Sequence, residues 1–265
     1  MCTLSWRKEG HRLEVLFNRD EQKSRLKAHE PQYWRDYHAV FPVDPQGGGT
    51  WLAVTENGDV YALLNNYQRS NDMLATTANH VTKHVTAHSE GEQIFPEKQW
   101  QSRGKVITLL LQRSDGSFQE NCTSLPLSSF LPFTLVHLHP TKATLCCHWD
   151  GETVRFEQPQ SPLISSGVAL EQVRDARHRC YAQHNQSLQD LRLFHQSHQP
   201  GPSALSVCMH REDAQTVSFS HIRISEQIEF HYQAGSPCMP LGPSVLVSVP
   251  RNADKASPKN NFSCL

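Results

Sequence analysis

The sequence lacks long apolar runs, a surplus of charge of one sign, and the common hydrolase motifs. No stretch approaches the ~18 apolar residues that a membrane helix needs, so we expect no integral membrane segment. The 25 Lys and Arg residues are balanced by 26 Asp and Glu residues, which argues against a nucleic-acid partner. The patterns GxSxG and HExxH do not occur, which disfavours a nucleophile-elbow serine hydrolase and a zincin.

The eight cysteines do not follow a disulfide or zinc-finger pattern. None of them forms a CxxC pair, and two of them, Cys146 and Cys147, are adjacent in the chain. Charged residues such as Arg7 and Glu14 interrupt the N-terminus, so we expect no secretory signal peptide. We therefore expect free thiols in a reducing compartment, a cytoplasmic location and no metal site.

The order of the predicted elements indicates an α+β fold. With 265 residues, the chain lies at the upper end of the size of one domain. Alternating strands come first, then a mixed region, a strand meander, a helical stretch and further strands, which favours layered, mainly antiparallel sheets over repeated βαβ units. We predict one domain over residues 1–250 and a polar, mobile tail over 251–265.

Turn residues between alternating segments locate the strands. The predicted hairpins and meander have turns at Glu9-Gly10, Asn57-Gly58 and Asp150-Gly151. Their strands are 2–7, 13–18, 50–55, 60–64, 133–137, 144–148 and 154–156, and later strands are predicted at 205–209, 216–221 and 228–232.

Other stretches of the chain are less regular. Residues 167–198 have helical spacing, whereas 105–112 fits either a strand or a helix. Residues 21–46 are polar and predict a loop that borders a pocket, and 68–100 give no assignment. The glycine run 47–49 predicts a tight turn that presents Trp51, in preference to a phosphate cradle, because no P-loop pattern is present.

Cys2 is the strongest candidate for a catalytic residue. If Met1 is removed, Cys2 carries both a thiol and a free α-amine, which is a nucleophile with its own base. Their ordinary pKa values, about 8.5 and about 7.7–8, are closely matched. A nearby Arg19 would favour the thiolate, and Asp20 could hold the amine. The alternative is that Cys2 is a small buried apolar residue of the first strand.

Several short motifs occur in a fixed order along the chain. They are Met1-Cys2, Asn18-Arg19-Asp20-Glu21, Gly48-Gly49-Thr50-Trp51-Leu52, Leu64-Asn65-Asn66-Tyr67 and Cys208-Met209-His210-Arg211 with Thr216-Val217-Ser218. In this combination the chain resembles the NRDE family, also called the transport-and-Golgi-organisation-2-like family, over residues 1 to about 240.

The resemblance implies the fold of the N-terminal-nucleophile hydrolases, an αββα four-layer sandwich. Relatives with that fold pair an N-terminal cysteine with an arginine and an aspartate. The implied catalytic residues here are Cys2, Arg19, Asp20 and, as oxyanion donor, Asn66. The implied substrate-binding residues are Asn18, Glu21, Trp51 and Arg211.

Two functional hypotheses follow, and a third ranks below them. The first is a Cys2-based hydrolase of a small amide or acyl compound that needs no cofactor. The second is a non-enzymatic protein that carries haem in the same cleft, since the family is linked to haem trafficking. The third is a structural or membrane-traffic adaptor. The sequence does not indicate an oligomeric state.

Histidines are frequent in this chain, which has 16 of them. An axial haem ligand could be Cys2, His137, His139 or His148. His80, His84 and His88 recur every four residues, and for them we expect a solvated surface rather than a metal site.

Overall fold

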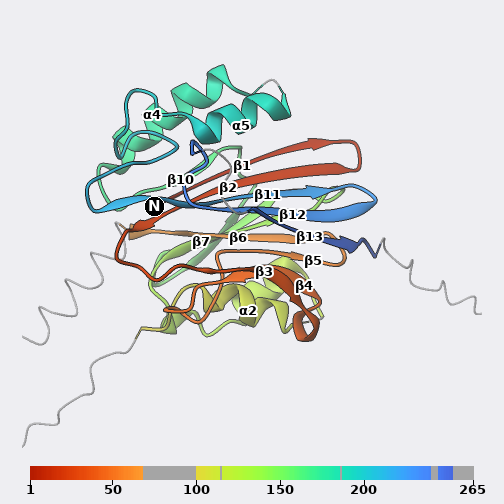
Figure 1. Ribbon diagram of the computed structural model, residues 1–265. Coiled ribbons are helices and arrows are strands. Elements are labelled where there is room, and N and C mark those ends of the chain that lie inside the picture. The colour runs from red at the N-terminus through yellow and green to blue at the C-terminus, as the bar shows by residue number, and fades with distance from the viewer. Residues whose placement is uncertain (68–99, 114, 186, 240–243, 253–265) are drawn as a thin grey trace, which may run out of the picture.

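Two antiparallel β-sheets lie face to face in the computed structural model, and helices cover their outer faces (Figure 1). The structure describes residues 1–67, 100–113, 115–185, 187–239 and 244–252. Helices α4 (Leu170–Gln183) and α5 (Leu188–Gln196) cover one sheet, and α2 (Lys105–Leu111) and α3 (Phe118–Thr123) cover the other. The predicted four-layer α+β sandwich is confirmed.

The six-stranded sheet carries the N-terminus at one of its central strands. Its strand order is β10-β1-β2-β11-β12-β13. The bounds are β1 Cys2–Glu9, β2 Arg12–Gln22, β10 Leu163–Ser165, β11 Ala214–Ile224, β12 Gln227–Ala234 and β13 Ser244–Pro250.

The seven-stranded sheet is a meander in chain order, from β3 to β9. The bounds are β3 His29–Trp34, β4 Ala39–Val43, β5 Leu52–Thr55, β6 Val60–Asn65, β7 Phe133–Leu138, β8 Leu145–Trp149 and β9 Val154–Glu157. Two short 3₁₀ helices complete the described elements, η1 at Arg35–Tyr37 and η2 at Leu127–Ser129.

Strand β2 is buried on both faces because helices cover one side and the second sheet covers the other. Leu13, Val15 and Phe17 point into the core between the sheets, where they pack with residues such as Leu52 and Phe230. Successive strand residues alternate between faces, so the even-numbered residues of β2 point toward the helices. This alternation decides which functional side chains of β2 can meet.

The ambiguous segment 105–112 is helical. Val106, Ile107 and Leu110 are buried at helical spacing against the seven-stranded sheet. The next helix, α3, begins with a capping box in which Ser117 and Glu120 satisfy each other's backbone N–H groups. A helix rather than a strand therefore occupies this stretch.

Most predicted strands and the helical stretch 167–198 are confirmed. The hairpins around Gly10 and Gly58 and the turn at Gly151 form with positive φ at each glycine. The helical stretch is divided into α4 and α5. Most of the predicted tail 251–265, from residue 253 onward, and the run His80, His84 and His88 lie outside the described residues.

The prediction of a loop over 21–46 is wrong, because this segment contains β3, η1 and β4. Strand β3 is the edge strand of its sheet and contains Pro31, which edge strands tolerate. Its exposed, polar residues gave no alternation to detect. Parts of the segment do line cavities, as described below: Glu21 and residues 25–28 line one, and Tyr37 and His38 line another.

The prediction of a strand over 205–209 is also wrong, because the segment is an irregular loop. Ser206 accepts a hydrogen bond from the N–H of Ser203, and its hydroxyl lies 2.8 Å from the carbonyl oxygen of Cys208. Serine side chains that bond to nearby backbone compete with strand pairing.

The glycine turn brings a distant loop to the start of β5. The N–H of Thr50 donates to the carbonyl of Gly104 at 3.0 Å. A Cβ atom on Gly49 would lie 2.3 Å from the carbonyl carbon of Gly104, so this approach requires glycine. The predicted tight turn before Trp51 is present, and the contact also positions the loop that carries Arg103.

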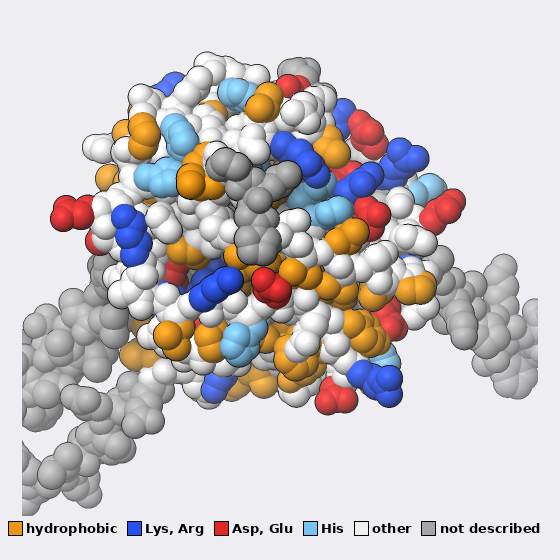
Figure 2. All heavy atoms as spheres, viewed as in Figure 1, with side chains coloured by type: hydrophobic (Ala, Val, Ile, Leu, Met, Phe, Trp, Pro, Cys, Tyr) orange, Lys and Arg blue, Asp and Glu red, His pale blue; other side chains and the backbone are white. Residues whose placement is uncertain are grey.

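Surface charge is mixed on the face drawn in Figure 2, where basic and acidic side chains are interspersed. Among the residues that the structure describes, no helix has both the length and the apolarity of a membrane span.

A candidate active site at the start of the first strand

Cys2 begins β1, between β2 and β10 of the six-stranded sheet. Its register partners are Arg19 on β2 and Ser165 on β10. The side chain is half-buried and packs against the core between the two sheets. The thiol therefore lies on the side of the sheet that faces the second sheet.

Arg19 lies on the same face as Cys2, because directly opposed residues of antiparallel strands share a face. The Arg19 guanidinium stacks over the ring of Trp51 at 4.3 Å from its centroid. Its Nη2 atom is 3.4 Å from Asp44 and 3.7 Å from Glu21. The structure thus brings four predicted site residues together: Cys2, Arg19, Glu21 and Trp51.

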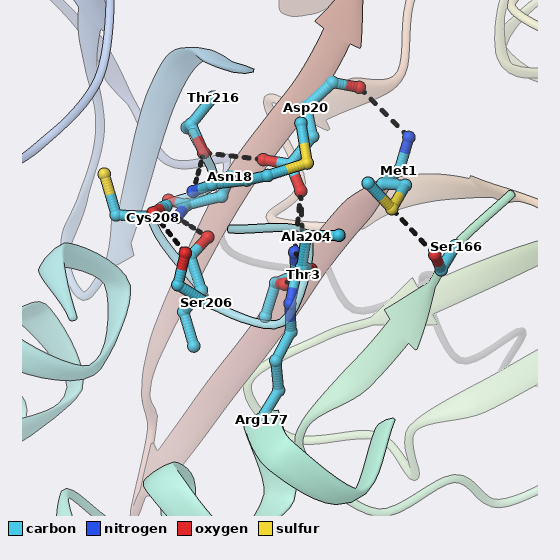
Figure 3. A network of polar contacts seen from close by, with 12 residues as sticks. Met1, Thr3, Asn18, Asp20, Ser166, Arg177, Ala204, Ser206, Cys208 and Thr216 are labelled. Carbon is cyan, nitrogen blue, oxygen red and sulfur yellow. Dashed lines mark hydrogen bonds and ion pairs between the residues drawn. The ribbon is translucent and has the colours of Figure 1, made fainter. Parts of the chain in front are cut away.

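The backbone of Met1 extends the ladder between β1 and β2 by one residue. The N–H of Asp20 donates to the carbonyl of Met1 at 3.0 Å, and the Met1 ammonium donates to the carbonyl of Asp20 at 3.1 Å. The ammonium also lies 3.3 Å from the hydroxyl of Tyr67. Figure 3 shows Met1 beside Asp20, with Ser166 near its sulfur.

The protonation states of the Met1 ammonium and the Cys2 thiol depend on the burial of both groups and on the charges around them. Burial lowers the pKa of the Met1 ammonium, but Tyr67, Cys2 and Asp20 outweigh it, and the pKa is raised overall. Burial also raises the pKa of the Cys2 thiol, opposed in part by the ammonium and by Arg19. While Met1 is present, both groups are protonated at neutral pH and neither is ready to act as nucleophile or base.

The Asp20 carboxylate points to the opposite face from the thiol. It accepts hydrogen bonds from both terminal nitrogens of Arg177 at 3.2 Å and from the hydroxyl of Thr216 at 2.7 Å (Figure 3). Arg177 belongs to α4 and is fully buried, and it also bonds to Thr3 and to the carbonyl of Ala204. Asp20 therefore joins β2, α4 and β11 directly behind Cys2.

The structure does not bring Asn18 or Arg211 to the thiol. Asn18 is fully buried on the helix side, where its amide nitrogen donates to the carbonyls of His195 and Val207. Its amide oxygen lies 2.9 Å from the ring of His195. Arg211 pairs with Asp213 on its own turn at 2.7 Å.

Asn66 follows the end of β6, where its N–H donates to the carbonyl of Pro132. The preceding residue, Asn65, donates its amide to the hydroxyl of Tyr67 at 2.9 Å. Since Tyr67 also accepts from the Met1 ammonium, this asparagine pair lies next to the N-terminus.

Sequence reasoning missed several residues of the site. Arg103 lies over the ring of Tyr67, with its guanidinium carbon 5.5 Å from the ring centroid, and burial lowers its pKa. Asp44 holds Arg19 and Arg25. Tyr67 is the last residue of the motif Leu64-Asn65-Asn66-Tyr67, so the sequence contained a signal that it could belong to the site. Arg103 and Arg177 have no local pattern, because only the folded chain brings them here.

Two cavities in the described part of the chain bear on the function. One of about 150 Å³ adjoins the site and is lined by Arg19, Glu21, Arg25, Leu26, Lys27, Ala28, Val217 and Tyr232. Another of about 770 Å³ lies under α2 and α3 on the outer face of the seven-stranded sheet, and none of the predicted catalytic residues lines it. The site chemistry therefore adjoins the smaller cavity.

The family model for Transport and Golgi organisation 2 matches residues 1–197. The chain belongs to this family. No curated protein matches the chain.

The fold of this chain is similar to the solved structures of several hydrolases. The Caenorhabditis elegans N-acylethanolamine-hydrolyzing acid amidase ortholog has 9% identity and a TM-score of 0.51, covering 91% of this chain and 94% of its own. A penicillin V acylase from Agrobacterium tumefaciens has 9% identity and a TM-score of 0.48, and the match covers 94% of this chain and 86% of the acylase. A mutant conjugated bile acid hydrolase from Clostridium perfringens has 10% identity and a TM-score of 0.48, and the match covers 95% of this chain and 93% of the hydrolase. The first likeness shows the N-terminal-nucleophile hydrolase fold, and at such identity it shows the fold alone.

The buried pair of Asp20 and Arg177 supports the first strand pair, so its loss should destabilise the protein. Arg177→Met leaves the carboxylate buried without its charge partner, and we expect a loss of about 3–5 kcal/mol in the free energy of unfolding. Denaturant unfolding measures this loss. The matched control is Arg174→Met on the same helix, whose arginine pairs with Glu171 at the surface and should cost less than about 1 kcal/mol.

Adding Asp20→Asn to Arg177→Met should recover part of the stability, because no uncompensated charge remains. Equal stabilities for Arg177→Met and Arg174→Met would contradict the role of this ion pair.

Proposed function

We propose that this protein is a cysteine N-terminal-nucleophile hydrolase that acts on a small amide or acyl compound after Met1 has been removed. The observation that carries the proposal is the register that sets Cys2 opposite Arg19 at the N-terminal end of the first strand. The fold likeness to an N-acylethanolamine-hydrolyzing acid amidase is consistent with amide chemistry.

Removal of Met1 is a requirement of the proposal. With Met1 present, the nitrogen of Cys2 is in a peptide bond, and the free ammonium belongs to Met1 and stays protonated. Once Met1 is gone, the amine of Cys2 is adjacent to its own thiol and can accept the thiol proton. The positive charge of Arg19 then stabilises the thiolate.

The reaction would proceed through an acyl-enzyme. The Cys2 amine takes the thiol proton, and the sulfur forms a bond to the substrate carbonyl carbon. The carbon–nitrogen bond of the substrate breaks as the ammonium returns the proton to the leaving nitrogen. Water then cleaves the thioester, which yields a carboxylic acid and restores the thiol.

Two groups are candidates to stabilise the oxyanion. The predicted donor is Asn66, and its neighbour Asn65 already bonds to Tyr67 beside the N-terminus. The indole N–H of Trp51 is buried and makes no hydrogen bond within the described part of the chain. A buried donor without a partner is costly, so a substrate oxygen would satisfy it.

The small cavity suggests which part of the substrate binds near the thiol. Arg19, Arg25 and Lys27 line it together with Glu21 and the apolar Leu26 and Ala28. Its volume of about 150 Å³ accommodates a compact polar group rather than a folded protein segment. We therefore propose a small-molecule substrate.

Replacement of the nucleophile is the direct test. A panel of small N-acyl amides and thioesters is screened with the protein lacking Met1, and Cys2→Ala should lower turnover of any substrate found by at least about a thousandfold. The control Cys122→Ala removes a buried thiol from the helix-covered core of the other sheet and should retain turnover. Equal turnover by the wild type and Cys2→Ala would refute the proposal.

Haem carriage is the second candidate. The sequence-based hypothesis put haem in the cleft of Cys2, whereas one observation favours the larger cavity as the site to test. In that cavity, His137 stacks on Tyr61 and Phe118. Its Nε2 bonds to Asp59 at 2.7 Å, while its Nδ1 is buried without a partner among the described residues. A histidine oriented by a carboxylate is a common metal ligand.

Titration with haem distinguishes the two cavities. Haem carriage in the larger cavity predicts a saturable absorbance change that His137→Ala abolishes and Cys2→Ala preserves. A titration indistinguishable from that of a non-binding control protein would eliminate this candidate.

A further inference from the structure

Four potential metal ligands converge where the loop between α5 and β11 meets the segment that follows β12. They are His198, Cys208, His210 and Cys238, called here the 198–238 cluster. One ligand atom from each side chain can be chosen so that all four lie within 4.8 Å of one another. We infer that the 198–238 cluster is a zinc site.

The cluster is assembled from two loops that are distant in sequence. His198 follows the end of α5, and the N–H of Cys208 donates to the carbonyl of Ser197 at 3.0 Å, which turns the loop back on itself. His210 forms a bridge with Gln215 at the start of β11. Cys238 lies beyond the end of β12. The sequence predicted no metal site because no two of these residues form a CxxC or HExxH pattern.

The distances match those of a tetrahedral site. With Zn–S near 2.3 Å and Zn–N near 2.0–2.1 Å, neighbouring sulfur and nitrogen ligands lie about 3.6 Å apart. The Nε2 atom of His210 is 3.6 Å from the sulfur of Cys208 and 3.3 Å from that of Cys238. The Nε2 atom of His210 and the two sulfurs are therefore already at nearly the spacing that one shared ion would impose.

An unsatisfied nitrogen provides independent support. The Nε2 atom of His198 is buried and has no hydrogen-bond partner among the described residues. Its ring lies against that of His210, with centroids 5.1 Å apart. A buried nitrogen without a partner costs free energy, and coordination to an ion would remove that cost.

The ligand set selects the ion. Two thiolates and two imidazoles in a closed four-coordinate arrangement are typical of structural zinc, whereas carboxylate-poor sites do not suit magnesium or calcium. A site with four protein ligands leaves no position open for substrate, so the ion would be structural rather than catalytic.

The proposed ion would hold the loop that supports the N-terminal site. Met209, between two of the ligands, packs on Met1, and its backbone bonds to Thr216 in both directions. Thr216 in turn donates to the Asp20 carboxylate. The site is thus connected to the candidate active site, but zinc binding does not depend on the proposed hydrolysis.

A second group of potential ligands provides a matched control. Cys146, His148 and Glu157 also lie close together, but they supply only three ligands, and Glu157 is exposed. The ring nitrogens of His148 already contact Thr134, Cys146 and Glu157. Cys146→Ser therefore changes a cysteine beside a histidine without touching the 198–238 cluster.

The test uses the full chain without a tag, purified with a reductant and without chelators. Metal analysis should give about one zinc per chain for the wild type and for Cys146→Ser. Cys208→Ser and His198→Ala should lower zinc affinity by more than about 100-fold, since even residues that only orient ligands contribute 10–100-fold. Cobalt added to chelator-treated wild type should produce thiolate charge-transfer and tetrahedral ligand-field absorption.

A measurement of thermal stability distinguishes the loss of zinc binding from a failure of the variants to fold. Zinc should raise the Tm of the chelator-treated wild type and leave that of the double variant Cys208→Ser/Cys238→Ser unchanged. The inference is overturned if the reduced wild type binds neither zinc nor cobalt, if a Cys208–Cys238 disulfide replaces metal binding, or if Cys146→Ser rather than Cys208→Ser removes the metal.

Discussion

The register between β1 and β2 is the constraint on which the candidate site depends. It pairs Cys2 with Arg19, and strand alternation then sends both side chains toward the second sheet while Asn18 and Asp20 face the helices. A slip of one residue would exchange these faces and separate the thiol from the guanidinium. The buried core on both sides of β2 prevents that slip, because Leu13, Val15 and Phe17 fit only one face.

The polar groups behind the site form one continuous network. Asp20 receives Arg177 from α4 and Thr216 from β11, and Thr216 bonds to the backbone of Met209. Burial makes each of these groups costly if it is unpaired, so the network fixes the relative positions of the strands and the helix. The same loop carries His198, Cys208 and His210 of the 198–238 cluster, so one part of the chain serves both the fold and the proposed zinc site.

Local signals in the sequence were sufficient to predict several turns and the strand pair that carries the candidate nucleophile. Asn57-Gly58 and Asp150-Gly151 mark turns by their own chemistry, and the motifs around Cys2 and Arg19 identified the strand pair that carries the thiol. Strand β3 was missed because an exposed edge strand needs no apolar alternation. Arg103, Arg177 and the 198–238 cluster were missed because their contacts join segments far apart in the chain, and no spacing encodes them.

The central claim is that Cys2 acts with a free amine, and the mass of the intact, untagged protein tests it most directly. Both N-terminal groups are held protonated while Met1 is in place, so the account predicts a mature chain lighter by one methionine residue. A mass that retains Met1 in protein from a host with active methionine aminopeptidase would contradict it, because the Cys2 nitrogen would then remain in a peptide bond.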